Sequence, residues 1–296
     1  MGTRGIQERK CTAQTLRCIV SVRGLGIAMD REDWLDYVSL QCVMYCPPAQ
    51  YSPEVQSQRV KYSYLASVSA RFLASPQYTR PTKKTIDALN VRGYALDNGA
   101  YLCHINDNRF DEAAFLQYCA RYGQYADWIA IPDVVCNASE TLKNIPVYMK
   151  KIRQIVPNSR LLLVWQDGMT ARDLMPYLKK RIGVFVGGST EGKLAAMHWI
   201  ADLCRRYDVW CHVGRVNSVK RLAAVLSCGA HSFDGSGIVR YLPTLKRMTE
   251  HLICTAGQLN LFDCKKMDMQ ILKSWLREKR RLKCDTHIVN SGRFNA

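Results

Sequence analysis

From about residue 90 onward, short apolar runs alternate with longer stretches in which apolar residues recur at helical spacing. The runs end in polar or glycine-containing turns and are rich in Val, Ile, Leu and aromatic residues, which is typical of strands buried on both faces. Six runs fit this description: Gly93–Leu96, Trp128–Ile131, Leu161–Trp165, Ile182–Val186, Val209–Val213 and Ala230–Phe233. Two further strands are expected earlier in the chain, among Cys18–Val22, Gln41–Cys46 and Tyr64–Ser69.

Polar residues typical of helix starts precede three of the amphipathic stretches, and a glycine typical of helix ends follows the last. These signals are Asp111 and Glu112 before Phe115–Tyr122, Thr170 with Asp173 before Leu174–Lys180, and Asn217 before Val219–Cys228, which Gly229 ends. Strands that alternate with helices indicate right-handed βαβ units and a parallel sheet. Six strands plus two predict an α/β fold, a (β/α)8 TIM-type barrel, with a doubly wound sheet as the alternative.

The chain is expected to divide into a barrel domain, residues 1–253, and a C-terminal basic helical tail, residues 254–296. Within the tail, Met267–Leu282 has apolar residues at helical spacing and ends among basic residues that include Arg280 and Arg281. Such a helix can pack on the barrel and contact phosphates, or it can be an ordinary solvated helix.

The charge of the chain points to a polyanionic partner. The 296 residues carry 42 Lys and Arg against 25 Asp and Glu, a net charge of +17, and basic surfaces gain affinity for nucleic acid by releasing counterions. A hydrophobic content of 48% excludes a mainly disordered chain. No apolar run approaches the roughly 18 residues of a membrane helix, and the first ten residues do not resemble a signal peptide. The 13 cysteines are scattered without a C-x-x-C pair, so we expect reduced thiols and a cytoplasmic protein.

Reactive residue types follow the predicted strands, whose C-terminal ends form one mouth in a barrel of this kind. They are Asp97, Asp133, Gln166, Gly187 with Gly188, Gly214 with Arg215, and Asp234. Carboxylates at the mouth can act as nucleophile and as general acid or base. A buried Asp and Gln can accept and donate hydrogen bonds along a purine edge, and a Gly-Gly turn lets backbone amides approach a planar ligand.

Taken in order, these segments resemble the tRNA-guanine transglycosylase (queuine/guanine tRNA-ribosyltransferase) superfamily, and within it the DNA-modifying DpdA-type branch. The resemblance covers about residues 93–240, where six segments correspond to family motifs. The D-S-G-G-Y motif resembles Asp97-Asn98-Gly99-Ala100-Tyr101, the base-recognising Asp resembles Asp133, V-Q-G resembles Trp165-Gln166-Asp167-Gly168, G-G-x-x-x-G resembles Gly187–Gly192, G-V-G resembles His212-Val213-Gly214, and F-D-C resembles Phe233-Asp234-Gly235.

The resemblance implies an enzyme that exchanges guanine in DNA for a 7-deazaguanine such as 7-cyano-7-deazaguanine. Asp234 would be the nucleophile that forms a covalent nucleotide intermediate, and Asp97 the general acid/base. The base would be bound by Asp133, Gln166, Gly187, Gly188 and Gly214, and nucleic acid by Arg215, Arg240, Arg280 and Arg281. His212 is a further candidate for contacting the flipped nucleotide or a phosphate, whereas His231 need not share its face. Asp167 and Glu191 are alternative acids whose other explanation is capping or surface charge.

The resemblance implies no redox cofactor and no nucleoside triphosphate. The tRNA enzymes hold zinc with C-x-C-x-x-C and a distant His, and the late candidates here, Cys254, Cys264, Cys284 and His287, have a different spacing. We therefore expect no metal, with zinc at these four residues as the alternative.

Other functions stay open at this point. The same chemistry could act on tRNA without a zinc module, the barrel could be a non-catalytic nucleic-acid-binding subunit, or Gly187-Gly188 could belong to an unrelated phosphate-binding enzyme. The segment Gln258-Leu259-Asn260-Leu261-Phe262 resembles the extended peptide by which bacterial proteins bind the DNA sliding clamp. The alternative is that Leu259, Leu261 and Phe262 pack on the barrel. A bacterial or virus-infected cell is the expected setting.

Overall fold

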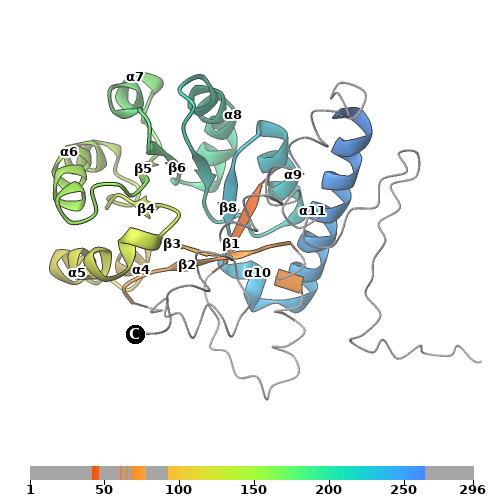
Figure 1. Cartoon of the computed structure of the whole chain (residues 1–296), viewed down its shortest axis with the longest axis horizontal. Coiled ribbons are helices and arrows are strands. Elements are labelled where there is room, and N and C mark those ends of the chain that lie inside the picture. Colours follow the sequence, from red (N-terminus) through yellow and green to blue (C-terminus); the bar gives the residue numbers. More distant parts are fainter. Residues whose placement is uncertain (1–41, 47–60, 62–63, 66–67, 78–92, 264–296) are drawn as a thin grey trace, which may run out of the picture. The chain divides into compact units, whose positions relative to one another are not determined.

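The protein folds as a closed barrel of parallel strands in the computed structural model, which describes residues 42–46, 61, 64–65, 68–77 and 93–263. Within these residues, eight strands pair in chain order, and β1 closes the ring by pairing with both β2 and β8 (Figure 1). The strands are β1 (Val43–Cys46), β2 (Arg71–Ala74), β3 (Tyr94–Leu96), β4 (Ile129–Ala130), β5 (Leu161–Trp165), β6 (Ile182–Val186), β7 (Cys211–Val213) and β8 (Ser232–Asp234). This is the predicted (β/α)8 TIM-type fold, and the doubly wound alternative is wrong.

Helices follow each strand from β3 onward (Figure 1). They are α4 (Ala100–Ile105), α5 (Glu112–Tyr122), the 3-10 helix η1 (Gly123–Tyr125), α6 (Ala138–Ile155), α7 (Ala171–Leu174), the 3-10 helix η2 (Met175–Tyr177), α8 (Thr190–Arg206), α9 (Val219–Cys228), α10 (Ser236–Arg240) and α11 (Leu242–Asp263). The alternation places the C-terminal ends of all eight described strands at one mouth.

The two early strands were harder to predict. β1 lies within the predicted Gln41–Cys46, but the second strand is Arg71–Ala74 and the prediction of Tyr64–Ser69 is wrong. The chain turns there instead, because the amides of Val68 and Ala70 both donate to the carbonyl of Leu65, at 3.3 and 3.0 Å. The third candidate, Cys18–Val22, lies outside the described residues.

Helix starts were predicted well at two sites. Asp111 caps α5 by accepting a 2.9 Å hydrogen bond from the amide of Ala114, and Thr170 with Asp173 forms the expected capping box. The helix after that box begins at Ala171 and becomes a 3-10 turn at Met175, so the predicted helix over Leu174–Lys180 is wrong. Pro176 within this turn has no amide hydrogen and cannot extend an α-helix.

The predicted cap of α9 is off by one residue. Ser218, not Asn217, accepts from the amide of Arg221, at 3.3 Å, whereas Gly229 ends the helix with φ +72° as expected. Asn217 accepts a 2.9 Å hydrogen bond from the amide of Gly237 instead. It therefore connects the turn after β7 to the start of α10.

Aromatic rings fill the barrel interior below the mouth. The ring of Trp128 lies 5.2 Å from Tyr45, 5.9 Å from Phe185 and 4.7 Å from His212, measured between centroids. Tyr45, Trp128 and His212 are fully buried. Rings in edge-on and tilted contact give the mouth a rigid floor.

A polar cluster joins the start of β2 to the residue two before β4. Arg71 and Asp127 are 2.5 Å apart (Nη1 to Oδ1), and the hydroxyl of Tyr45 donates to the other Asp127 oxygen at 3.0 Å. The side chains of Arg71 and Asp127 are 27% and 22% exposed. Loss of one partner therefore leaves the other as an unpaired, half-buried charge.

We expect Arg71→Met to lower the free energy of unfolding by about 1–3 kcal/mol, measured by urea denaturation. The matched control is Lys143→Met, because its ion pair with Glu140 is mostly exposed, and we expect a change within about 0.5 kcal/mol there. Equal effects of the two substitutions would contradict the structural role given to the buried cluster.

Other predictions concern the tail, the thiols and the membrane. The chain divides into two compact units, Met1–His251 and Leu252–Ala296, and the predicted boundary after residue 253 stays a prediction. The predicted helix Met267–Leu282, with Arg280 and Arg281, lies outside the described residues. Eight cysteines of the described part are free, and all but Cys136 are buried. No helix in the described ranges has the length and apolar character needed to cross a membrane.

Candidate active site

The structure gathers most of the predicted site residues at the C-terminal mouth of the barrel. Asp234 is the last residue of β8, and the others lie within three residues of the ends of β3 to β7. They are Asp97 after β3, Asp133 after β4, Gln166 after β5, Gly187 and Gly188 after β6, and Gly214 and Arg215 after β7.

Asp133 is held by a carboxamide on each side. The Nδ2 of Asn98 donates to one carboxylate oxygen at 2.8 Å, and the Nε2 of Gln166 donates to the other at 2.6 Å. Burial raises the pKa of Asp133, and these two hydrogen bonds oppose the rise. Because each carboxylate oxygen can accept about two hydrogen bonds, Asp133 keeps acceptor capacity toward the mouth.

Both carboxamides are themselves fixed. Asn98 also donates to the carbonyl of Ile131 at 2.9 Å and accepts from the amide of Ala100 at 2.8 Å, while Gln166 accepts from the amide of Cys136 at 3.2 Å. Gln166 therefore positions Asp133, and its contact with a purine stays a prediction. The role of Asn98 was not found from the sequence, where Asn98 stands only as the residue in place of the serine in the D-S-G-G-Y motif. Its signal was a carboxamide directly after a predicted strand.

Asp97 titrates near neutrality. Its pKa is raised to about 7 by burial and by the charges of Asp234 and Asp133, while hydrogen bonds from the amides of Asn98 and Gly99 act in the other direction. The coupling shows that the three carboxylates share one electrostatic environment. A carboxyl with such a pKa can both donate and accept a proton at physiological pH.

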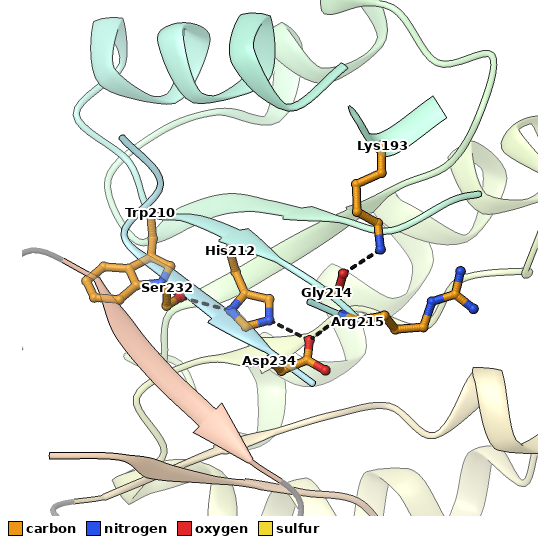
Figure 2. A network of polar contacts seen from close by, with 7 residues as sticks. All are labelled: Lys193, Trp210, His212, Gly214, Arg215, Ser232 and Asp234. Carbon is orange, nitrogen blue, oxygen red and sulfur yellow. Dashed lines mark hydrogen bonds and ion pairs between the residues drawn. The ribbon is translucent and has the colours of Figure 1, made fainter. Parts of the chain in front are cut away.

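Asp234 is 7% exposed, and the described residues that bind its carboxylate all contact the same oxygen. Its Oδ1 accepts from the Nε2 of His212 at 3.0 Å and from the amide of Arg215 at 3.3 Å, as Figure 2 shows. His212 is fully buried under Asp234, so the expectation that it contacts a nucleotide or a phosphate is wrong. His231 is exposed, accepts from the amide of Cys211, which begins β7, and takes no part in the mouth.

The turn after β6 depends on Asp167. Its carboxylate accepts from the amide and the hydroxyl of Ser189, at 2.5 and 2.9 Å. Gly188 has φ +68°, and a Cβ there would lie 2.5 Å from an oxygen of Asp167, so the turn requires glycine. Asp167 thus has the capping role given as the alternative to catalysis, and Glu191 is an exposed surface charge.

Gly235, which directly follows Asp234, is closely approached by backbone. A Cβ on Gly235 would lie 2.5 Å from the carbonyl oxygen of Val216. The chain that follows β7 approaches too closely for a cysteine at this position.

Two basic side chains, Arg215 and Lys193, lie beside the turns that follow β6 and β7. The guanidinium of Arg215 lies 4.7 Å from the ring centroid of Tyr101, and its Nη2 donates to the carbonyl of Gly188 at 3.0 Å. Lys193, in α8, is buried and donates to the carbonyl of Gly214. Burial, together with the charge of Arg215, lowers the pKa of Lys193 to about 8. Sequence reasoning missed Lys193, although it directly follows the glycine-rich turn. Arg240 is exposed at the end of α10.

The side chains of two predicted features, the alternative zinc site and the clamp-like segment, lie wholly or partly outside the described part of the chain. Among the described residues, no three His, Cys, Asp or Glu side chains are placed so that they could hold a metal ion. Cys264, Cys284, His287 and the side chain of Cys254 lie outside the described part. The clamp-like segment Gln258–Phe262 is helical, as the last part of α11, and not the extended peptide assumed from the sequence. The side chains of this segment are also outside the described part.

Comparisons with known proteins add little to this geometry. No protein-family model matches the chain, and no curated protein does. Among solved structures, one described as "a putative deoxyribose-phosphate aldolase from Coccidioides immitis" is similar at a TM-score of 0.46 and 11% sequence identity, over 71% of this chain and 87% of that chain. A likeness this distant says nothing about the reaction.

Proposed function

We propose that this protein is a DNA-guanine transglycosylase, a glycosyltransferase that exchanges guanine in DNA for a 7-deazaguanine base. The observation that carries the proposal is the grouping of Asp97, Asp133 and Asp234 at one barrel mouth, in three different environments. The carboxyl of Asp97 has a pKa of about 7, and the carboxylate of Asp133 accepts hydrogen bonds from two carboxamides. The carboxylate of Asp234 accepts its hydrogen bonds from the described residues through Oδ1. These environments suit an acid/base, a base-binding group and a nucleophile.

The proposed reaction has two displacements at the same carbon. A guanine nucleotide flips out of the duplex, at a cost of a few kcal/mol. Asp234 attacks C1′, the bond from C1′ to N9 breaks, and Asp97 protonates the departing guanine. Asp97 then takes the N9 proton of the incoming base, whose N9 attacks C1′ and releases the Asp234 carboxylate. Each proton given up is recovered, and two inversions retain the configuration of the sugar.

The carboxylate of Asp133 is the proposed hydrogen-bond acceptor for guanine. Guanine presents the N1–H and the N2 amino group as neighbouring donors, and a fixed carboxylate accepts from both. A 7-deazaguanine keeps this edge and differs at position 7, so the same pocket accepts both bases.

The net charge of +17 supports a nucleic-acid substrate, and the late cysteines lack the zinc spacing of the tRNA enzymes, which favours DNA. Arg215 at the mouth and exposed Arg240 are proposed phosphate contacts, with Arg280 and Arg281 in the tail. A sliding-clamp contact through Gln258, Leu259, Leu261 and Phe262 is a further proposal that rests on the residue pattern alone, because the structure shows this segment as part of a helix.

The test is incorporation of radiolabelled guanine into duplex DNA and, in parallel, into unmodified tRNA. Label that enters DNA alone supports the proposal. Label in tRNA alone keeps the chemistry and overturns the substrate. Label in neither contradicts the proposed activity and favours a non-catalytic binding subunit.

Asp133→Asn is expected to raise the KM for guanine about 100-fold, with a smaller effect on kcat. The new amide group faces donors from Asn98, Gln166 and guanine, and such a mismatch of buried polar groups costs about 2–3 kcal/mol. Saturation kinetics with labelled guanine measures the change, and Glu191→Gln, on the surface of α8, is the control. An unchanged KM for guanine would remove Asp133 from base recognition.

A further inference from the structure

The two carboxylate oxygens of Asp234 have different surroundings. Oδ1 accepts from the Nε2 of His212 and from the amide of Arg215, at 3.0 and 3.3 Å. No described residue makes a hydrogen bond to Oδ2. One oxygen is therefore anchored to the barrel, and the other accepts no hydrogen bond from the described part of the chain.

We propose that His212 is a positioning residue that anchors Asp234 through Oδ1, so that Oδ2 is the oxygen that attacks the sugar. The inference rests on the proposed function, because it gives an atom-level role to the nucleophile of that reaction.

A chain of hydrogen bonds along the inner face of β7 and β8 fixes the donor on His212. The indole Nε1 of Trp210 donates to the hydroxyl oxygen of Ser232 at 2.8 Å, and that hydroxyl lies 2.8 Å from the Nδ1 of His212 (Figure 2). The indole can only donate, which leaves the Ser232 hydrogen free to point at Nδ1. Nδ1 then accepts, and the proton of a neutral imidazole is on Nε2, facing Asp234.

The buried surroundings of His212 favour this neutral form. Burial lowers the pKa of His212, although the neighbouring Asp234 acts against the change. The imidazole packs between rings, with centroids 4.5 Å from Phe185 and 4.7 Å from Trp128. A ring enclosed in this way cannot swing out to a substrate, so it can act only through Asp234.

The second donor to Oδ1, the amide of Arg215, is also held in place by a hydrogen bond to its own peptide unit. Lys193 donates to the carbonyl of Gly214, and the same peptide unit presents the amide of Arg215 to Asp234 (Figure 2). Both donors are thus held before any substrate binds, which keeps the carboxylate plane constant through the reaction.

The anchored oxygen has a chemical role in the second displacement. When the ester bond from Oδ2 to C1′ breaks, its electron pair returns to the carboxylate and negative charge reappears on both oxygens. The Nε2–H of His212 stabilises that charge at Oδ1 without touching the sugar or the base. Loss of this donor is therefore expected to affect turnover more than base binding.

The experiment compares His212→Leu with His212→Gln in the full-length protein, using labelled-guanine exchange into DNA. Leucine removes the donor, whereas the glutamine amide places an N–H near the position of Nε2. We expect His212→Leu to lower kcat about 100-fold with the KM for guanine within about 3-fold of wild type, and His212→Gln to recover at least about 10-fold of the loss. His198→Leu, an exposed histidine of α8, is the matched control.

Three results overturn the inference. They are an unchanged kcat in His212→Leu, equal losses in the leucine and glutamine variants, or a KM that rises in parallel with the loss of kcat. If His212→Leu does not fold, Ser232→Ala tests the same relay, with an expected loss of about 10-fold in kcat and an unchanged KM. Asp234→Asn, compared with the wild-type protein, distinguishes a failure of the proposed function from a failure of the inference alone. Exchange that survives this substitution places the nucleophile elsewhere and defeats the inference. Absence of exchange in the wild-type protein defeats the proposed function, and loss of exchange in Asp234→Asn together with a fully active His212→Leu defeats only the inference.

Discussion

Replacement of Asp234 by asparagine is expected to abolish base exchange and to leave nucleic-acid binding intact. A neutral amide cannot form the ester to C1′, so the rate of labelled-guanine incorporation should fall at least about 10⁴-fold. The side chain keeps its shape, and its oxygen can still accept from His212 and from the amide of Arg215. Affinity for a DNA duplex, measured by fluorescence anisotropy at constant salt, should stay within about 2-fold.

The matched control for this substitution is Asp208→Asn. Asp208 is exposed, precedes β7 and has φ +51°, a conformation that asparagine tolerates. Exchange should be unchanged there. Exchange that persists in Asp234→Asn would place the nucleophile elsewhere, and loss of DNA binding together with exchange would indicate a damaged fold.

Asp97→Asn is expected to lower the exchange rate about 10³-fold, because asparagine can neither protonate the departing guanine nor take the proton of the incoming base. The wild-type rate should change most steeply around pH 7, where Asp97 changes its protonation state. In the variant, the residual rate should lose this feature. A pH profile that is the same in both proteins would show that another group carries the proton.

The same substitution is expected to stabilise the fold, and the sign follows from the pKa. Asp97 ionises near its ordinary pKa of 3.8 in the unfolded chain but at about 7 in the folded protein. Between these values the unfolded state releases a proton that the folded state retains, so stability falls as the pH rises and the penalty is complete above about pH 7. Asp97→Asn removes the penalty.

We expect the free energy of unfolding of Asp97→Asn to exceed that of wild type by about 1–2 kcal/mol at pH 8 and to match it near pH 4, measured in urea. The expected difference in unfolding free energy is smaller than the whole pKa shift of Asp97 implies, because its side chain is partly accessible to water. A variant that is less stable than wild type at pH 8 would mean that Asp97 is held by favourable contacts and is not poised near neutrality.

The barrel and most of the mouth could be predicted from the sequence, because each depends on local signals. Short apolar runs mark strands, and parallel strands in a closed barrel bring Asp97, Asp133 and Asp234 together whatever the loops do. The second early strand was misplaced because Tyr64–Ser69 is as apolar as a strand. Only the backbone hydrogen bonds to Leu65 show the turn.

The supporting residues could not be found in the same way, since their roles depend on which side chains meet across the barrel. Asn98 and Gln166 reach Asp133 from two different strand ends. Asn217 and Ser218 are adjacent and both can cap a helix, so the sequence does not distinguish them. One signal was available for the hydrogen bonds that join Trp210, Ser232, His212 and Asp234. Side chains two positions apart on a strand point to the same face, so Trp210 shares a face with His212, and Ser232 shares the inner face with Asp234.

The central claim is that a nucleotide becomes attached to Asp234 during base exchange. Its most direct test is to incubate the protein with end-labelled duplex DNA in the absence of free base, to denature it, and to map any attached DNA to a peptide by mass spectrometry. The account predicts a DNA strand that lacks one guanine, joined to the peptide that contains Asp234. An adduct on Asp97 or Lys193, or exchange activity with no adduct at all, would contradict it.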